Sequence, residues 1–121
     1  MGRSAWSKRN SANKVWLVCD ESGESPVAEF VNALDDRTLT ETAELFDWTE
    51  VNGPPRNEEK FKSVGSGVFE FKVHRAKAIR YLAVRRTFGW LIVLAENKKK
   101  SNAFQSDIKR AKGIAGRWGG E

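Results

Sequence analysis

Three consecutive lysines, Lys98, Lys99 and Lys100, separate the hydrophobic run WLIVLAE from a segment with helical spacing. They belong to a strongly basic half of the chain. Residues 61–121 hold fourteen Lys/Arg and four Asp/Glu, a net charge of +10, whereas residues 1–60 hold seven and twelve, a net charge of −5. Such asymmetry indicates a polyanionic partner for the basic half, most often nucleic acid. The alternative is a set of solvated surface lysines.

Three further residues have side chains suited to phosphate chemistry. His74, the only histidine, lies two positions after Lys72, so both side chains point to one face if the segment is a strand. Imidazole titrates near neutral pH and is a natural proton carrier. Arg80 has apolar neighbours, and its planar guanidinium can bind two phosphate oxygens at once. The alternatives are an ordinary surface histidine, a solvated strand lysine, and an ion pair between Arg80 and Glu70.

Composition limits the class of protein. A chain of 121 residues with 40% hydrophobic content can bury one modest core. We therefore expect one domain over residues 14–118, with a flexible basic arm at 1–13 and a flexible tail at 119–121. The single cysteine, Cys19, cannot form an internal disulfide, and no His/Cys cluster has metal-ligand spacing, so no cofactor is expected. The apolar runs are too short for a bilayer and no signal peptide is visible, which favours a cytoplasmic protein.

A strand and two helices are predicted in the N-terminal half. KVWLVC is rich in β-formers and indicates the first strand. In SPVAEFVNAL, Ser25 suits the N-cap and Pro26 the first helical position, and apolar residues recur at helical spacing. A second helix is predicted to begin at Thr38, as a Thr-x-x-Glu capping box with Glu41, and to end at VNGPPRNEE.

Three strands follow, with GSGVF as a turn before the first of them. VFEFKVH, AIRYLAVRR and WLIVLAEN have strand character, and TFG joins the last two in an antiparallel meander. Alternation in VFEFKVH predicts an apolar set that faces the core, Phe69, Phe71 and Val73. The opposite set is predicted to face solvent: Val68, Glu70, Lys72 and His74.

A terminal helix completes the predicted order. Apolar residues recur at helical spacing from Phe104 to Ala115, after a box-like start at Asn102 and Gln105. Trp16, Trp48 and Trp90 are expected to fill the core or its edges. The order is β-α-α-β-β-β-α, and the expected fold class is α+β: a small antiparallel-rich sheet with an N-terminal helical hairpin and a C-terminal helix.

The order and spacing of these motifs resemble the RelE/HigB-like toxins of bacterial and phage toxin–antitoxin systems. The stretch FKSVGSGVFEFKVHRAKAIRYLAVRRTFGWLIVLAENKKKSNAFQSDIKRA carries the resemblance, over about residues 60–115. It contains a Lys-x-Val-Gly-x-Gly segment followed by Glu-hydrophobic-Lys, a strand with an arginine, a valine-containing strand ending in Lys-Lys-Ser, and a terminal helix. Each motif is degenerate, and their order is the specific feature.

The resemblance implies a metal-independent endoribonuclease that enters the ribosomal A site and cleaves mRNA. The 2′-hydroxyl of a nucleotide attacks its own 3′ phosphate in such enzymes, so the site needs cations aimed at the phosphate and groups that move protons. By this resemblance the catalytic residues are Lys72, Arg80, His74 and Lys98. The substrate-binding residues are Lys62, Arg75, Lys99, Lys100 and Phe104.

One position departs from the family. Several ribosome-dependent members have a tyrosine at the start of the last helix, where this chain has Phe104. Phenylalanine can stack on a base but cannot donate a proton. Proton transfer would then fall to His74 or a lysine. The missing tyrosine is also compatible with a weak or inactive member of the family.

Two other functional classes remain open from the sequence. ParE-like members of the same scaffold inhibit DNA gyrase without cleavage, and a non-toxic phage-derived protein would bind nucleic acid without turnover. Lys72→Ala and Arg80→Ala are expected to abolish the activity of an RNase while leaving the fold intact.

A toxin would also have a cognate antitoxin, which would cover the basic groove or dock on the acidic hairpin EFVNALDDRTLTETAELF.

Overall fold

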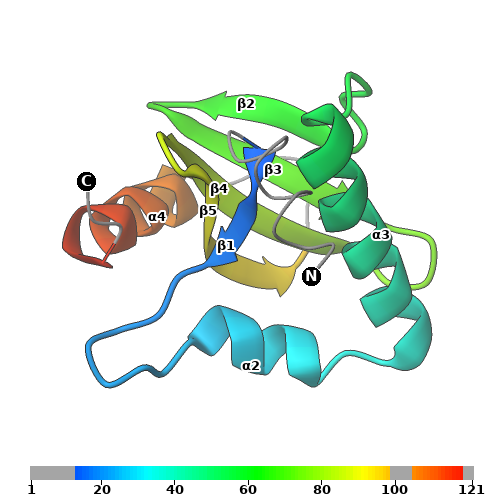
Figure 1. Cartoon of the computed structure of the whole chain (residues 1–121), viewed down its shortest axis with the longest axis horizontal. Coiled ribbons are helices and arrows are strands. Elements are labelled where there is room, and N and C mark those ends of the chain that lie inside the picture. Colours follow the sequence, from blue (N-terminus) through cyan, green and yellow to red (C-terminus); the bar gives the residue numbers. More distant parts are fainter. Residues whose placement is uncertain (1–12, 99–104, 119–121) are drawn as a thin grey trace, which may run out of the picture.

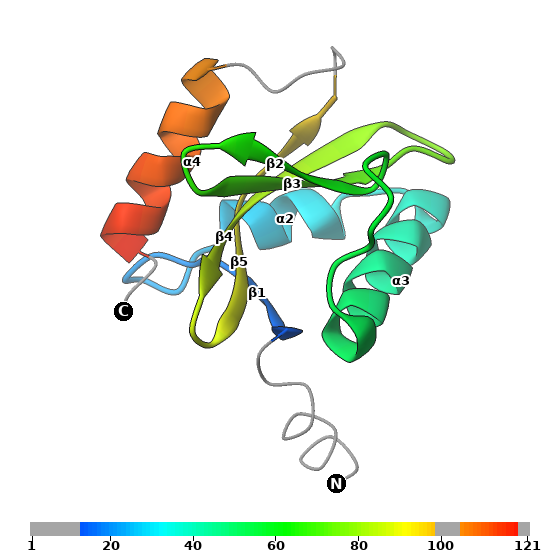
Figure 2. The same ribbon diagram turned by 90° about the horizontal axis from the view of Figure 1, so that it is seen from above.

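The computed structural model describes residues 13–98 and 105–118. Its elements in chain order are β1 (Val15–Leu17), α2 (Pro26–Asn32), α3 (Asp36–Asn52), β2 (Phe61–Gly65), β3 (Val68–Val73), β4 (Ile79–Arg86), β5 (Gly89–Asn97) and α4 (Gln105–Trp118). The strands lie between α3 and α4 in Figure 1, and the view from above in Figure 2 shows the same arrangement.

Five strands form one mixed sheet in the order β1-β5-β4-β3-β2. β2, β3, β4 and β5 are antiparallel neighbours, and β1 runs parallel to β5. The α+β fold class and the antiparallel meander are thereby confirmed.

The sheet has one strand more than expected, because β2 pairs with β3. The two strands are joined at Ser66 and Gly67, whose φ angles are 59° and 79°, so the predicted turn is confirmed. The true order is β-α-α-β-β-β-β-α. The sequence gives a weak strand signal here because Lys62, Ser63 and Gly65 interrupt the apolar alternation.

The helical hairpin begins as predicted in α2 and differently in α3. Ser25 Oγ accepts a hydrogen bond from the Ala28 amide at 3.0 Å, which confirms the N-cap of α2. The N-cap of α3 is Asp35, three residues before Thr38, so the predicted capping box is wrong. Glu41 instead turns toward the chain after β3, where its carboxylate accepts hydrogen bonds from the amides of His74 and Arg75.

The two faces of the sheet are covered by different helices. On one face, Phe46 of α3 packs edge-on against Phe71 and Tyr81, with ring centroids 5.9 and 5.1 Å apart. On the other, the Arg86 guanidinium donates to the Ala115 carbonyl of α4 at 3.4 Å. The buried residues of α4 are Asp107, Ile108, Ala111 and Ala115. The sheet therefore has a covering helix on both sides.

This double covering changes the predicted environment of β3. Phe71 and Val73 are buried as expected, and Phe69 is partly buried against the core. The opposite face is not solvent-exposed as predicted, because Val68, Glu70 and Lys72 are buried too. His74 follows the end of the strand and is exposed. Burial of charged strand residues requires compensating partners, which the neighbouring strands supply.

Candidate active site

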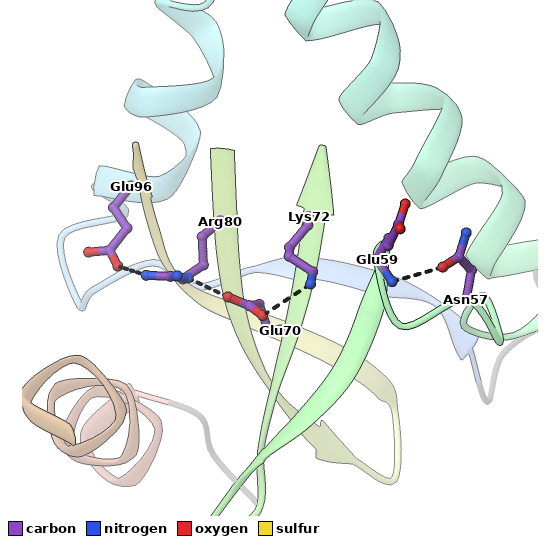
Figure 3. A network of polar contacts seen from close by, with 6 residues as sticks. All are labelled: Asn57, Glu59, Glu70, Lys72, Arg80 and Glu96. Carbon is purple, nitrogen blue, oxygen red and sulfur yellow. Dashed lines mark hydrogen bonds and ion pairs between the residues drawn. The ribbon is translucent and has the colours of Figure 1, made fainter. Parts of the chain in front are cut away.

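A row of charged side chains crosses three adjacent strands on the sheet face that bears α4. Lys72 of β3 lies opposite Arg80 of β4, and Arg80 lies opposite Glu96 of β5. Glu70 precedes Lys72 by two positions, so alternation places it on the same face. Figure 3 shows the four side chains in this order, from Glu96 through Arg80 and Glu70 to Lys72. The strand register therefore brings together residues far apart in the sequence.

Arg80 is the centre of this row and is 1% exposed. Its Nε donates to Glu70 Oε2, and its Nη1 lies 3.3 Å from Glu96 Oε2. The ion pair between Arg80 and Glu70, one of the alternatives from sequence, is thus present. A guanidinium held by two carboxylates is fixed in position.

Lys72 is held more loosely, although it is only 7% exposed. Its Nζ lies 3.8 Å from Glu70 Oε1, too far for a hydrogen bond. Within the part of the chain that the structure describes, Glu70 Oε1 accepts no hydrogen bond. Burial lowers the pKa of Lys72, and Glu70 opposes this shift. The buried ammonium would be stabilised by an added anion.

Two more predicted lysines lie close to Lys72. Lys62 of β2 is opposite Glu70 in the β2–β3 register. The Lys98 amide donates to the Ala78 carbonyl at 2.8 Å and so continues the pairing of β4 with β5. The positive charges of both lysines further lower the pKa of Lys72, as does that of Arg80. Lys62, Lys72, Arg80 and Lys98 thus form one group, here called the cationic cluster.

Other predicted site residues lie elsewhere or outside the described residues. Arg75 is 65% exposed, and its guanidinium pairs with Glu44 at 2.9 Å and Glu41 at 3.5 Å, both on α3. His74 is exposed beyond the end of β3, and its role as a proton carrier remains a prediction. The residues outside the described ranges are Lys99, Lys100 and Phe104.

Sequence reasoning missed a carboxyl pair beside the cluster. Burial raises the pKa of Glu96, and the hydrogen bond and negative charge of Asp107 raise it further, while Arg80 opposes the shift. Asp107, in the first turn of α4, is itself buried. Asp107 therefore favours the protonated form of Glu96. The sequence shows an acidic residue in a strand and another in a helix, but their contact depends on how α4 packs.

The burial of Arg80 limits its use in a test of function. Arg80→Ala would leave the fully buried Glu70 without its hydrogen-bonded cation. Breaking a buried pair in this way costs about 3–5 kcal/mol. The expectation that this variant keeps the fold intact is therefore revised, and Lys72 becomes the residue to change.

Residues 13–98 and 105–118 lack two features that would indicate other classes of protein, a metal-binding cluster and a membrane-spanning helix. No group of three or more His, Cys, Asp or Glu in these ranges is arranged to hold a metal ion. None of the helices seen there has the length and apolar character needed to cross a membrane.

Comparison with known families gives one finding. The chain matches the model of the family described as "Phage derived protein Gp49-like (DUF891)" over residues 29–114, more than two thirds of its length. This family is associated with toxin–antitoxin toxins of the RelE/HigB type. Searches of curated proteins and of solved structures returned no significant match. The matched span includes all four residues of the cationic cluster.

Proposed function

Because the chain belongs to the phage-derived Gp49-like family, we propose that it is the toxin of a toxin–antitoxin system and that it cleaves mRNA in the cytoplasm, in the ribosomal A site. The observation that carries this proposal is the cationic cluster. Four cations from β2, β3, β4 and the end of β5 gather on one sheet face, and the Lys72 ammonium has no hydrogen bond to the carboxylate beside it. A phosphate is an anion that this arrangement would stabilise.

The proposed reaction begins with attack of a 2′-hydroxyl on its own 3′ phosphate. A 2′,3′-cyclic phosphate forms, and the bond to the 5′ oxygen of the next nucleotide breaks. Lys72 and Arg80 would stabilise the extra negative charge of the phosphorane, and Lys62 and Lys98 would hold the flanking phosphates. Each cation contributes through its position and charge, so none needs to form a covalent bond.

Two protons move in this reaction. A base accepts the proton of the 2′-hydroxyl, and an acid gives one to the departing 5′ oxygen. His74 or a lysine can act here, as the resemblance implies. The pair of Glu96 and Asp107 adds a carboxyl group next to Arg80 that holds a proton more tightly than an ordinary glutamate.

Cleavage of end-labelled mRNA by the purified protein, with and without programmed ribosomes, tests the proposal. We expect cuts only on ribosomes, with a cyclic phosphate or 3′ phosphate on the upstream fragment and a 5′-hydroxyl on the downstream one. Downstream fragments with a 5′ phosphate would contradict the proposed chemistry. Absence of cuts by the folded protein under both conditions would rule out the proposed nuclease activity.

A second candidate function is favoured by one observation. Lys72 and Arg80 are buried and already face Glu70 and Glu96, so the cluster is partly neutralised. A gyrase inhibitor, or a phage-derived protein that binds nucleic acid without cleaving it, would need such a group only for its fold. Relaxed plasmid that gyrase fails to supercoil in the presence of the protein would support the gyrase inhibitor.

The proposal also includes a protein partner. A cognate antitoxin would neutralise the toxin by covering the cationic cluster, or by docking on the acidic helices α2 and α3. Copurification with the product of the adjacent reading frame tests this. If the complex forms, Lys62→Ala would weaken it in the first arrangement and leave it unchanged in the second.

A further inference from the structure

A groove lies between α3, the loop after it and β3. Its volume is about 420 Å³, and the residues that matter for its chemistry are Glu44, Trp48, Arg56, Lys60, Lys72 and Arg75. Lys72 also belongs to the cationic cluster, so the groove and the proposed active site share this residue. In Figure 3 the loop that carries Asn57, another residue of the groove, lies near Lys72 and below α3.

Trp48 gives this groove an exposed aromatic surface. It is a residue of α3 and is 49% exposed, whereas Trp90 is buried among the rings of Phe61, Phe69 and Phe71. A large indole on a helix face leaves apolar area in water, and a flat partner would cover it. Nucleobases stack on such rings whatever their sequence, because every base has a π-face.

Two cations of the groove are available to an anionic ligand. Arg56 and Lys60 are exposed, and neither has an ion-pair partner in the described part of the chain. Arg75, by contrast, is held by Glu41 and Glu44. Arg56 and Lys60 both come from the loop between α3 and β2 and both line the groove. Their positions suit the phosphates on either side of a stacked base.

The carboxylates of the groove favour RNA over an acidic peptide as its ligand. Glu41 and Glu44 line it, and Glu44 is exposed. Glu41 is buried and already accepts the amides of His74 and Arg75. The exposed Glu44 pairs with Arg75, repels acidic side chains and can accept a hydrogen bond from the exocyclic amine of adenine, cytosine or guanine. Cations together with an aromatic ring and a carboxylate acceptor match a nucleotide better than a polyacidic segment.

We propose that this groove binds one nucleobase of the RNA, stacked on Trp48, with the neighbouring phosphates held by Arg56 and Lys60. The inference rests on the proposed function, since it takes RNA as the ligand. Lys72 lines the groove and belongs to the cluster, so the bound base belongs to a nucleotide next to the cleaved phosphate. Trp48 thereby becomes a binding residue for that nucleotide.

The test uses the full chain and a labelled RNA of about ten nucleotides with 2′-O-methyl groups throughout, which cannot undergo attack by a 2′-hydroxyl. Fluorescence anisotropy gives the dissociation constant for the wild type and for Trp48→Ala, Trp48→Phe and Trp16→Ala. Trp16 is the matched control, because it is 42% exposed but lies on β1 at the other edge of the sheet. Far-ultraviolet circular dichroism verifies that each variant is folded.

We expect Trp48→Ala to weaken binding by about 5- to 100-fold, Trp48→Phe to retain most of the affinity, and Trp16→Ala to bind as the wild type does. Replacing single nucleotides by abasic ones should weaken wild-type binding at one position of the RNA. Trp48→Ala should be insensitive to that replacement, because the base has already lost its stacking partner.

Three outcomes would overturn the inference: equal affinities for Trp48→Ala and Trp16→Ala, no position sensitive to base removal, or no RNA binding by the wild type at low salt. Binding of a polyglutamate peptide in place of RNA, lost in Trp48→Ala, would assign the groove to an acidic partner instead. Failure of the proposed function can be told apart from failure of this inference. RNA that binds through Trp48 but is never cut would contradict the nuclease activity and support the binding groove. Cleavage by a protein whose RNA binding is independent of Trp48 would support the nuclease activity and contradict the binding groove.

Discussion

The ammonium group of Lys72 is buried among like charges and has one carboxylate, Glu70, at 3.8 Å. Burial of a charge without a hydrogen bond lowers stability, so this residue weakens the fold in the absence of a ligand. Arg80 differs because two carboxylates hold it. Neighbouring cations on one sheet face thus have opposite effects on stability.

Lys72→Met is therefore expected to preserve or raise stability while removing the proposed activity. Methionine fills a similar volume without the buried charge, and Glu70 keeps its bond to Arg80. We expect the free energy of unfolding to stay level or rise by about 1 kcal/mol, measured by urea denaturation at pH 7. Arg80→Met is the contrasting variant, for which a loss of about 3 kcal/mol or more is expected. A loss of similar size in Lys72→Met would show that its ion pair stabilises the fold.

Glu96 makes the stability depend on pH in a defined direction. Its pKa in the folded chain is above the ordinary 4.5, because of burial and the neighbouring Asp107. The folded state then keeps a proton that the unfolded chain has already lost. The stabilising effect is complete below about pH 4.5 and disappears as the pH rises through the folded pKa.

Glu96→Gln cannot ionise and should lack this dependence. The free energy of unfolding of the variant minus that of the wild type should increase from pH 4.5 upward, until Glu96 is fully ionised in the folded wild type. Denaturation at several pH values measures this difference, with Glu58→Gln, an exposed glutamate of the α3–β2 loop, as the control. A difference for Glu96→Gln that is constant with pH would mean that Glu96 titrates normally.

At the scale of elements, the attachment of β1 to β5 depends on a close backbone approach at Gly89. A Cβ placed on Gly89 would lie 2.1 Å from the Lys14 carbonyl oxygen, and the residue has a φ of 134°. The Trp90 amide donates to that same oxygen at 2.7 Å. The first residue of β5 thus has no room for a side chain.

Gly89→Ala should destabilise the protein more than Gly65→Ala does. Gly65 also has a positive φ, 99°, but a Cβ there would meet nothing within 4 Å. Gly65→Ala would then bear only the conformational penalty of about 1–2 kcal/mol, whereas Gly89→Ala adds a backbone clash that must displace β1. Thermal unfolding of the two variants measures the difference. Equal midpoints would show that β1 contributes little to the folded state.

The elements also show what sequence patterns can and cannot predict. Ser25 and Pro26 mark α2 because capping is local, and β3, β4 and β5 have long runs of strand-forming residues. β2 has a weak pattern and owes its existence to pairing with β3. Asp35 and Thr38 are both suitable caps by residue type, so the local pattern alone does not choose between them. In the structure α3 begins after Asp35, and Glu41 bonds the chain after β3.

The candidate site likewise combines features that the sequence predicts with features that only the structure shows. Lys72 was predicted on one strand and Arg80 on the next, and antiparallel pairing puts them directly opposite each other. The burial of Lys72, the contact of Glu96 with Asp107, and the groove at Trp48 arise from helix packing. Such contacts have no local signature in the sequence, so they require the structure.

At the scale of the whole molecule, the basic half of the chain supplies the proposed RNA-binding surface. Its net charge of +10 over residues 61–121 should make RNA binding strongly dependent on salt. Lys62→Ala and Lys98→Ala should each reduce the slope of log affinity against log salt by about 0.7, the value for one phosphate contact on a single strand. Lys77→Ala is the control, because this exposed lysine lies in the loop between β3 and β4 and pairs with Asp35, the N-cap of α3. Equal slopes in all three variants would place the phosphate contacts elsewhere.

The central claim is that the cationic cluster stabilises a phosphate during RNA cleavage. The most direct measurement is the single-turnover rate of mRNA cleavage on programmed ribosomes for wild type, Lys72→Ala and Lys77→Ala, each first shown to be folded. We predict a loss of about 100- to 1,000-fold for Lys72→Ala, as for removal of one group that stabilises transition-state charge, and a wild-type rate for Lys77→Ala. Equal rates for the two variants would contradict the claim and leave the cluster as a structural feature of the sheet.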